Sequence, residues 1–257
     1  MTRKLCSLLL AGMLSAGPAV AQTSSSTFDH ELYDELLSEH VTARGMVDYD
    51  AFARSDDFQT YLDALADVDM ARLSTPERLA LWINAYNAYT IELINRHEED
   101  ESIRNINTTF GLGSGPWKER FADVGGETYT LDEIEHEIIR PRFQEPRIHF
   151  ALVCAAMGCP PLRQEAYTGP RIDEQLEEQA RVFLRRHTDK NRVDVEEGKI
   201  YLSSIFDWYR EDFPKGRDGL GEYLADFFPP GPERELLKSG DFEIEHTDYD
   251  WSLNAQR

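Results

Sequence analysis

The sequence predicts a single compact α+β domain, in which helices pack around a small mixed or antiparallel sheet with short β-hairpins. Three observations indicate this fold class. A long helical pattern of apolar residues covers positions 74–97. Two polar stretches turn at Gly125-Gly126 and near Gly198, as hairpins do. The apolar run "IHFALVC" at 148–154 has the composition of a central strand covered on both faces. Helices and short strands mixed in this way are typical of α+β domains.

The first part of the chain is predicted to be mainly helical. Apolar residues at helical spacing predict a helix over 28–41, and a second helix is expected over 58–68, after a short extended piece at 45–52. The helix over 74–97 begins with the capping-box residues Ser74 and Glu77. Its apolar residues cover most of its circumference, so we expect it to be buried on most sides, with Tyr86 on its main apolar face.

Two amides interrupt this buried helix. Asn84 and Asn87 lie three residues apart and therefore near one another on the helix surface. A buried amide must find hydrogen-bond partners. These side chains either brace neighbouring backbone, which we favour, or face a cleft.

The remaining elements follow in order along the chain. After the first hairpin, Thr130 and Glu133 form a second capping box and open a helix over 131–140 that carries Glu135 and His136. The apolar strand at 148–154 comes next. A helix at 172–186, the second hairpin, a short helix with Asp207, another over 220–228 and an extended end complete the expected fold. Trp208, Tyr209 and Trp251 are interpreted as packing residues.

The charge of the chain excludes some partners. It has 48 acidic and 27 basic residues, a formal net charge of −21. Nucleic acids and anionic membrane surfaces would repel such a protein.

Residues 1–21 have the pattern of a secretory signal peptide, with Arg3 and Lys4 before an apolar run and a cleavage site after Ala21. We therefore expect a periplasmic or secreted domain over 22–257, without stable membrane insertion after cleavage.

No metal or cofactor is predicted. The sequence has no CxxC pair and no HExxH motif. His30, His40, His97 and His187 lie in charged segments and are expected at the surface.

Five segments carry a resemblance to a known family. They are "LALWINAYNAYTI", "YTLDEIEHEIIRPRF", "PRIHFALVCAAMGCPPLR", "LSSIFDWYREDF" and "YDWSLN". In this order and spacing they resemble the bacterial, exported branch of the domain-of-unknown-function 547 family, over about 79–254. The best-marked segment contains Arg147, His149, Cys154 and Pro160. The resemblance implies that Cys159 is a weaker candidate for chemistry than Cys154.

Cys154 is the candidate nucleophile of a thiol-dependent hydrolase or acyl-transferase that acts on peptide or amide substrates. A cysteine nucleophile needs a base, and that base needs an orienting group. His149 is the nearest base in sequence, but strand alternation would place it on the face opposite Cys154. His136 is the other candidate base, and Asp207 or Glu135 could orient either histidine. The mixture of helices with a small sheet is compatible with a papain- or transglutaminase-like enzyme, although the order of cysteine and histidine differs.

Two other functions stay open at this point. Cys154 and Cys159 could form a disulfide in an oxidising compartment. The protein would then be a non-catalytic module that binds a small molecule, peptide or protein, with Asn84, Asn87, Arg163 and Tyr86 as candidate binding residues. A redox protein that cycles the two cysteines ranks third, because their spacing is longer than that of thioredoxin-like sites. The oligomeric state is not predictable.

Overall fold

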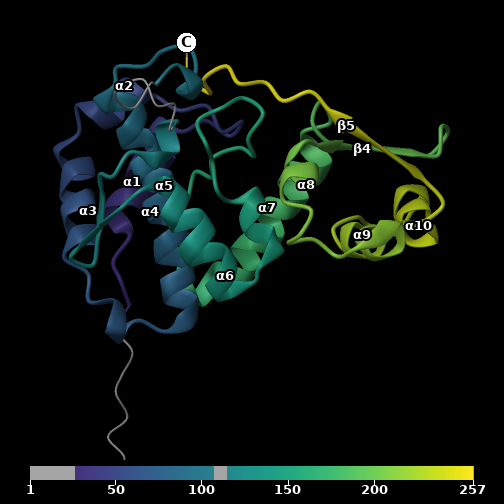
Figure 1. The fold of residues 1–257 in the computed structure, drawn as a ribbon, viewed down its shortest axis with the longest axis horizontal. Helices are drawn as coiled ribbons and strands as arrows, with labels where there is room; N and C mark the ends of the chain where they lie inside the picture. Colours follow the sequence, from purple (N-terminus) through teal and green to yellow (C-terminus); the bar gives the residue numbers. More distant parts are fainter. Residues whose placement is uncertain (1–26, 107–114, 257) are drawn as a thin grey trace, which may run out of the picture.

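The longest helix, α4 (Thr75–Arg96), organises the larger part of the molecule (Figure 1). The structure is a computed structural model, and it describes residues 27–106 and 115–256. Ser74 caps α4 by accepting a hydrogen bond from the backbone N–H of Glu77 at 3.4 Å. The capping box is only half formed, because the Glu77 carboxylate accepts from the backbone of Phe28 and Gly169 instead. The expected signal peptide lies outside the described residues.

Short helices surround α4 in the first part of the chain. α2 and α3 contact α4, and α1 contacts both of them. The bounds of the α-helices are α1 Glu31–His40, α2 Tyr49–Ala53, α3 Asp56–Ala66, α5 Leu131–Glu133, α6 Arg140–Phe143, α7 Ile172–Arg186, α8 Ile205–Trp208, α9 Gly216–Ala225 and α10 Pro232–Ser239. The 3-10 helices are η1 Met70–Arg72, η2 Ile103–Asn105, η3 Pro116–Lys118, η5 Pro146–Phe150 and η6 Gly169–Arg171.

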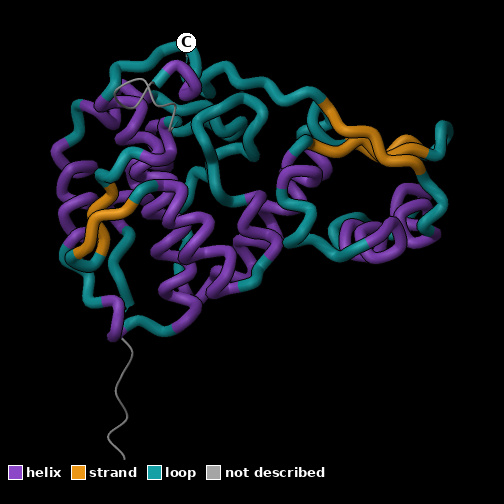
Figure 2. The backbone as a smooth tube through the Cα atoms, in the orientation of Figure 1, coloured by secondary structure: helices purple, strands orange, loops and turns teal. Residues whose placement is uncertain are grey.

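Two small sheets complete the fold (Figure 2). β1 (Ala122–Val124) and β2 (Glu127–Tyr129) form an antiparallel hairpin that turns at Gly125-Gly126, as predicted. β3 (Arg192–Asp194) pairs antiparallel with β4 (Lys199–Ser203), and β4 pairs parallel with β5 (Glu243–Thr247). The second sheet is therefore mixed, and the predicted α+β class is confirmed.

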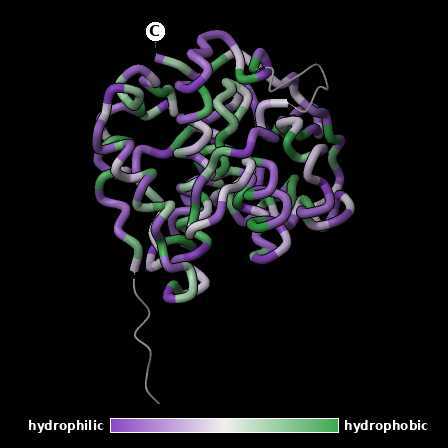
Figure 3. Tube along the Cα trace, turned by 60° about the vertical axis from the view of Figure 1, so that its left-hand side comes forward, coloured by the Kyte–Doolittle hydropathy of each residue, from purple (hydrophilic) through white to green (hydrophobic). Residues whose placement is uncertain are grey.

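The buried apolar residues form two clusters within one compact domain. The first cluster surrounds α4, and the second lies among η5, α7, α9 and the three-stranded sheet. In Figure 3, green hydrophobic and purple hydrophilic segments alternate along the described chain, as expected for helices with one buried face. In Figure 1 the segment after β5 runs back from the second cluster to the first, where Ala255 pairs with Val47.

The predicted central strand at 148–154 is wrong. Residues 146–150 form the 3-10 helix η5, which begins at Pro146. The expected ladder is replaced by one side chain: Asn87 Nδ2 donates to the Ala151 carbonyl at 3.0 Å, and the Val153 N–H donates to Asn87 Oδ1 at 2.9 Å. Because these bonds satisfy the buried backbone, the apolar run needs no neighbouring strand.

The predicted helix at 131–140 forms, but its centre is unusual. The capping box of Thr130 and Glu133 is present, and residues Ile134–Ile139 then form the π-helix η4. Pro141 follows, and a proline inside a helix removes one backbone donor and crowds the preceding turn. A π-turn relieves this crowding, and such turns occur often at functional sites.

Two other expectations need correction. His30 is buried, at 4% exposure, because its ring packs against Phe28 and Tyr61, and its Nδ1 lies 2.8 Å from the Tyr61 hydroxyl. The extended piece at 45–52 pairs only at Val47 and then becomes α2. Within residues 27–106 and 115–256, no helix combines the length and the apolar character that a membrane crossing requires.

Candidate functional site

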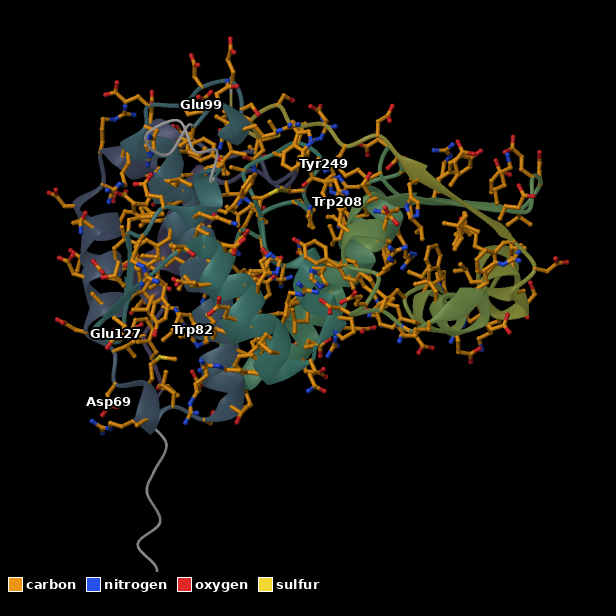
Figure 4. All side chains as sticks on the ribbon, viewed as in Figure 1. Asp69, Trp82, Glu99, Glu127, Trp208 and Tyr249 are labelled. Atoms are coloured by element: carbon orange, nitrogen blue, oxygen red, sulfur yellow. A yellow bond between two sulfur atoms is a disulfide. The ribbon has the colours of Figure 1, made fainter. Side chains whose placement is uncertain are left out.

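A cavity of about 220 Å³ lies where the two clusters meet. Its walls come from α4, the π-helix, η5, α8, the loop with both cysteines and the C-terminal segment. The lining residues are Tyr86, Trp117, Asp132, Glu135, His136, His149, Leu152, Cys154, Cys159, Pro160, Ile205, Trp208, Tyr209, Tyr249 and Trp251. Figure 4 shows Trp208 and Tyr249 beside one another there, with Trp82 in a separate part of the molecule. The cavity thus brings together most of the residues predicted for catalysis.

The two cysteines at this cavity form a disulfide, which confirms that candidate pairing. Cys154 is half-buried, whereas Cys159 is only 2% exposed. The Tyr249 hydroxyl lies 3.1 Å from both sulfurs. Cys154 is therefore the sulfur that a molecule in the cavity can approach.

The C-terminal segment holds the disulfide loop. The Met157 N–H donates to the Ser252 carbonyl and the Gly158 N–H to the Asp250 carbonyl, both at 2.7 Å. A Cβ on Gly158 would lie 2.8 Å from the Tyr249 ring, so only glycine permits this packing. Ala155, next to Cys154, has a left-handed φ of 63°, which is uncommon outside glycine. The loop is thus held in one conformation by segments distant in sequence.

His149 is oriented by an acid that the sequence did not indicate. Its Nε2 lies 2.7 Å from Asp212 Oδ2, and the same carboxylate pairs with Arg140 through Nε at 2.6 Å and Nη2 at 3.0 Å. Burial lowers the pKa of His149, although Asp212 acts in the opposite direction. Burial would raise the pKa of Asp212, but hydrogen bonds from Arg140 and His149 outweigh it and lower that pKa. A neutral His149 that donates to a charged Asp212 is the state that these shifts favour.

The tautomer of His136 is set by Arg140, and its Nε2 lies 3.9 Å from Asp132 Oδ1. Arg140 Nη1 lies 2.8 Å from His136 Nδ1. A guanidinium can only donate, so Nδ1 accepts and the proton of the neutral ring is on Nε2. Tyr209 stacks on His149 with centroids 4.0 Å apart and on His136 at 6.2 Å. His136 in this tautomer is therefore not a free base.

Glu135 projects from the π-helix into the cavity and is 7% exposed. The hydroxyls of Tyr86 and Tyr209 donate to its carboxylate. Burial raises the pKa of both phenols, and the charge of Glu135 raises it further. Both tyrosines therefore stay protonated and act as donors.

Aromatic rings form the opposite wall. The centroids of Trp208 and Tyr249 are 4.7 Å apart, those of Tyr249 and Trp251 are 4.6 Å apart, and Trp117 follows at 6.1 Å from Trp251. Trp208 is 47% exposed. Trp208 packs against Tyr249 and Trp251, as predicted, and the rest of its side chain is exposed at the cavity.

One segment of the chain, which contains several of the cavity residues, matches a known family. Residues 70–184 match the family model described as "Protein of unknown function, DUF547". This segment is a DUF547 domain. The expected resemblance continued to about residue 254, but the match ends at 184. No curated protein and no solved structure matches the chain.

The DUF547 domain supplies only part of the cavity. Glu135, His136, His149 and both cysteines lie inside the matched segment. Trp208, Tyr209, Tyr249 and Trp251 lie after it, as does Asp212. Of the four rings of the aromatic wall, Trp208, Tyr249 and Trp251 therefore lie outside the DUF547 match, and Trp117 lies inside it.

Four predicted residues do not line the cavity. Asn84 donates to the Tyr167 carbonyl at 2.7 Å and accepts from its N–H at 2.9 Å, so it braces backbone just as Asn87 does. Arg163 pairs with Glu165 and Glu178. Asp207 is exposed and points to another surface pocket beside Phe206 and Lys215. Tyr86 is the one of the four candidate binding residues that reaches the cavity.

Sequence reasoning missed Arg140, Asp212 and Tyr249 as site residues. Arg140 follows His136 by four residues, and this helical spacing was the only local signal. Asp212 is one of many acids, and nothing near it in sequence marks it. Among the residues that the structure describes, no group of three histidines, cysteines or acids is arranged to hold a metal ion.

Proposed function

We propose that the cavity is the ligand site of a non-catalytic binding module, in which the Cys154–Cys159 disulfide is structural. The exposed indole of Trp208 carries this proposal. This ring is 47% exposed at the cavity, beside two further aromatic rings. Covering its apolar surface with a ligand would be favourable, because that surface is removed from water. Rings of this kind are the usual anchors of binding sites.

The state of Cys154 supports binding over thiol catalysis. A thiol-dependent hydrolase or acyl-transferase needs a thiolate as nucleophile. The sulfur of Cys154 is bonded to Cys159, so it has no thiolate form in this state. Export across a membrane, as proposed from the signal pattern at 1–21, would keep such a pair oxidised.

The size of the cavity limits the ligand. Sites for drug-sized molecules usually measure roughly 300–1,000 Å³. A cavity of about 220 Å³ suits a small molecule or one side chain of a peptide. The open side, where Trp208 is exposed, leaves room for the rest of a longer ligand.

The four tryptophans provide a direct test. Trp117, Trp208 and Trp251 line the cavity, whereas Trp82 is 4% exposed and packs against Tyr129 in the first cluster. We expect 2-phenylethanol, a neutral aromatic probe, to shift the three cavity indole N–H signals in an NMR titration and leave that of Trp82 unchanged. Equal shifts of all four signals, or no shift at millimolar probe, would contradict the proposal.

A variant sharpens this test. Trp208→Ala should weaken probe binding at least about tenfold, a loss of about 1.4 kcal/mol of binding free energy. The same change should alter the free energy of unfolding by less than about 1 kcal/mol, because Trp208 lies outside both hydrophobic clusters. Val195→Ala removes another exposed apolar side chain, 43% exposed and away from the cavity, and is the matched control.

A further inference from the structure

We propose that the group held in this cavity is an organic cation with N–H donors, an ammonium or guanidinium, bound between the aromatic wall and Glu135. This inference rests on the proposed binding function and specifies its ligand. It starts from an unusual feature of Glu135, namely a buried carboxylate without a counter-ion.

Buried charges in proteins are normally paired. Glu135 is 7% exposed, yet within the described ranges no Lys, Arg or His nitrogen lies within 4.0 Å of its oxygens. Asp212 shows the contrast, since the same site gives it both Arg140 and His149. A ligand cation would supply the partner that the chain itself does not provide.

The carboxylate of Glu135 still has room for such a ligand. Its two oxygens offer about four lone-pair positions. Two of these accept hydrogen bonds from Tyr86 and Tyr209, which also hold the carboxylate in place. The remaining positions are free to accept N–H donors, which a quaternary ammonium lacks. Asp132, in the same wall, adds a second negative charge.

The aromatic wall is suited to cations as well. Two aromatic rings of the cavity already lie next to a guanidinium: Arg140 lies over Tyr209 and Arg104 over Trp251, each 5.1 Å from the ring centroid. The ring quadrupole that attracts these arginines acts equally on a ligand cation placed in the cavity. Trp208, which lines the cavity and is 47% exposed, offers a further ring for the same contact.

Repulsion from the protein is small. Arg140, which lies over Tyr209, is neutralised by its two-point pair with Asp212, and Arg104, which lies over Trp251, is exposed to solvent. The net charge of −21 attracts cations toward the molecule and opposes the approach of anions. An anionic ligand would also have to lie next to Glu135.

Three probes of similar size separate the outcomes. Phenethylamine, 2-phenylethanol and phenylacetate present a cation, a neutral group and an anion on the same ring. We expect phenethylamine to bind the wild-type protein at least about tenfold more tightly than 2-phenylethanol at neutral pH, and phenylacetate more weakly than both, by the tryptophan NMR titration. Equal binding of amine and alcohol would overturn the inference and leave the binding function intact. Absence of binding by all three would overturn the binding function itself.

A charge-removing variant tests the role of Glu135. In Glu135→Gln, the preference for amine over alcohol should fall to within about twofold. Glu137→Gln removes the same charge from an exposed position of the same π-helix and should keep the full preference. Retention of the preference in Glu135→Gln would contradict the inference. If that variant does not fold, the amine-to-alcohol ratio of the wild-type protein decides the question alone.

Discussion

The two hydrophobic clusters are built in different ways. The first surrounds one long helix, α4, whose buried residues follow each other along the chain. The second collects phenylalanines from short elements far apart in sequence, including Phe150, Phe183, Phe206 and Phe227. The segment η5 joins them, because Ile148 packs in the first cluster and Phe150 in the second. The cavity forms where the chain passes from one core to the other.

This difference explains where the candidate site lies. A helix that is buried on most sides leaves little room for a ligand. Short elements that meet from several directions leave a space at their junction, and the C-terminal segment closes it through Tyr249, which packs against both clusters. The first cluster thus supplies the frame of the site and packs against Trp117 and Trp251 of its aromatic wall, whereas the second cluster contributes Ile205 and packs against Tyr209.

The largest expected effect concerns the second cluster. Phe150 is fully buried and contacts the rings of Phe183, Phe206 and Phe213. Phe150→Ala should lower the free energy of unfolding by about 3–5 kcal/mol, through lost burial and the resulting cavity. Urea denaturation followed by circular dichroism measures this loss.

A matched substitution in the first cluster tests whether the two cores fold together. Leu81 is also fully buried, and Leu81→Ala should cost about 2–5 kcal/mol. We expect both variants to unfold in one cooperative transition. Two separate transitions in Phe150→Ala would show that the clusters are independent units.

The two amides of α4 give the next largest effect. Asn87→Ala leaves the backbone groups of Ala151 and Val153 unpaired and should cost about 2–4 kcal/mol. Asn84→Ala should cost a similar amount, because it leaves Tyr167 unpaired. Only Asn87→Ala should also shift the indole signals of Trp208 and Trp251 in the NMR spectrum. Equal shifts of these signals in both variants would show that the hydrogen bonds of Asn87 shape the cavity no more than those of Asn84 do.

The smallest expected effect is a pH dependence of stability that comes from the buried His30. Burial lowers the pKa of His30 to about 4. Below pH about 6.5 the unfolded chain binds a proton at this residue that the folded protein does not, so stability falls as the pH falls toward 4. At pH 5 the loss should be about 2 kcal/mol relative to pH 8.

Two variants isolate this contribution. His30→Gln should reduce the difference in unfolding free energy between pH 8 and pH 5 by about 2 kcal/mol, measured by urea denaturation at each pH. His149→Gln should reduce it less than His30→Gln, because Asp212 offsets the effect of burial. An unchanged difference in His30→Gln would contradict this explanation.

Local sequence patterns predicted the elements whose causes are local. The α4 helix, both hairpins and the capping box at Thr130 follow from spacing and turn residues within a few positions. The apolar run at 148–154 was predicted wrongly as a strand, because the side chain of Asn87, more than sixty residues earlier, replaces its ladder. Composition alone does not reveal such a partner.

In the candidate site, too, local sequence patterns predicted some residues and missed those that only the tertiary fold brings there. Cys154, His149, His136 and Glu135 were identified because their residue types are suited to chemistry, and they do line one cavity. Their partners Asp212 and Tyr249 reach the site only through the tertiary fold, from segments that are unremarkable by themselves. The sequence therefore predicted the reactive side chains and missed the groups that orient them.

The central claim is that the cavity is a non-catalytic ligand site with an oxidised Cys154–Cys159 pair. The redox state of these cysteines tests the claim most directly. The protein would be purified without reductant, denatured, treated with iodoacetamide and weighed by intact mass spectrometry. We predict no adduct on Cys154 or Cys159, and a mass lower than that of the reduced chain by two hydrogen atoms. Adducts on both residues, together with rapid alkylation of native Cys154 below the usual thiol pKa of about 8.5, would contradict the account and support a thiol enzyme.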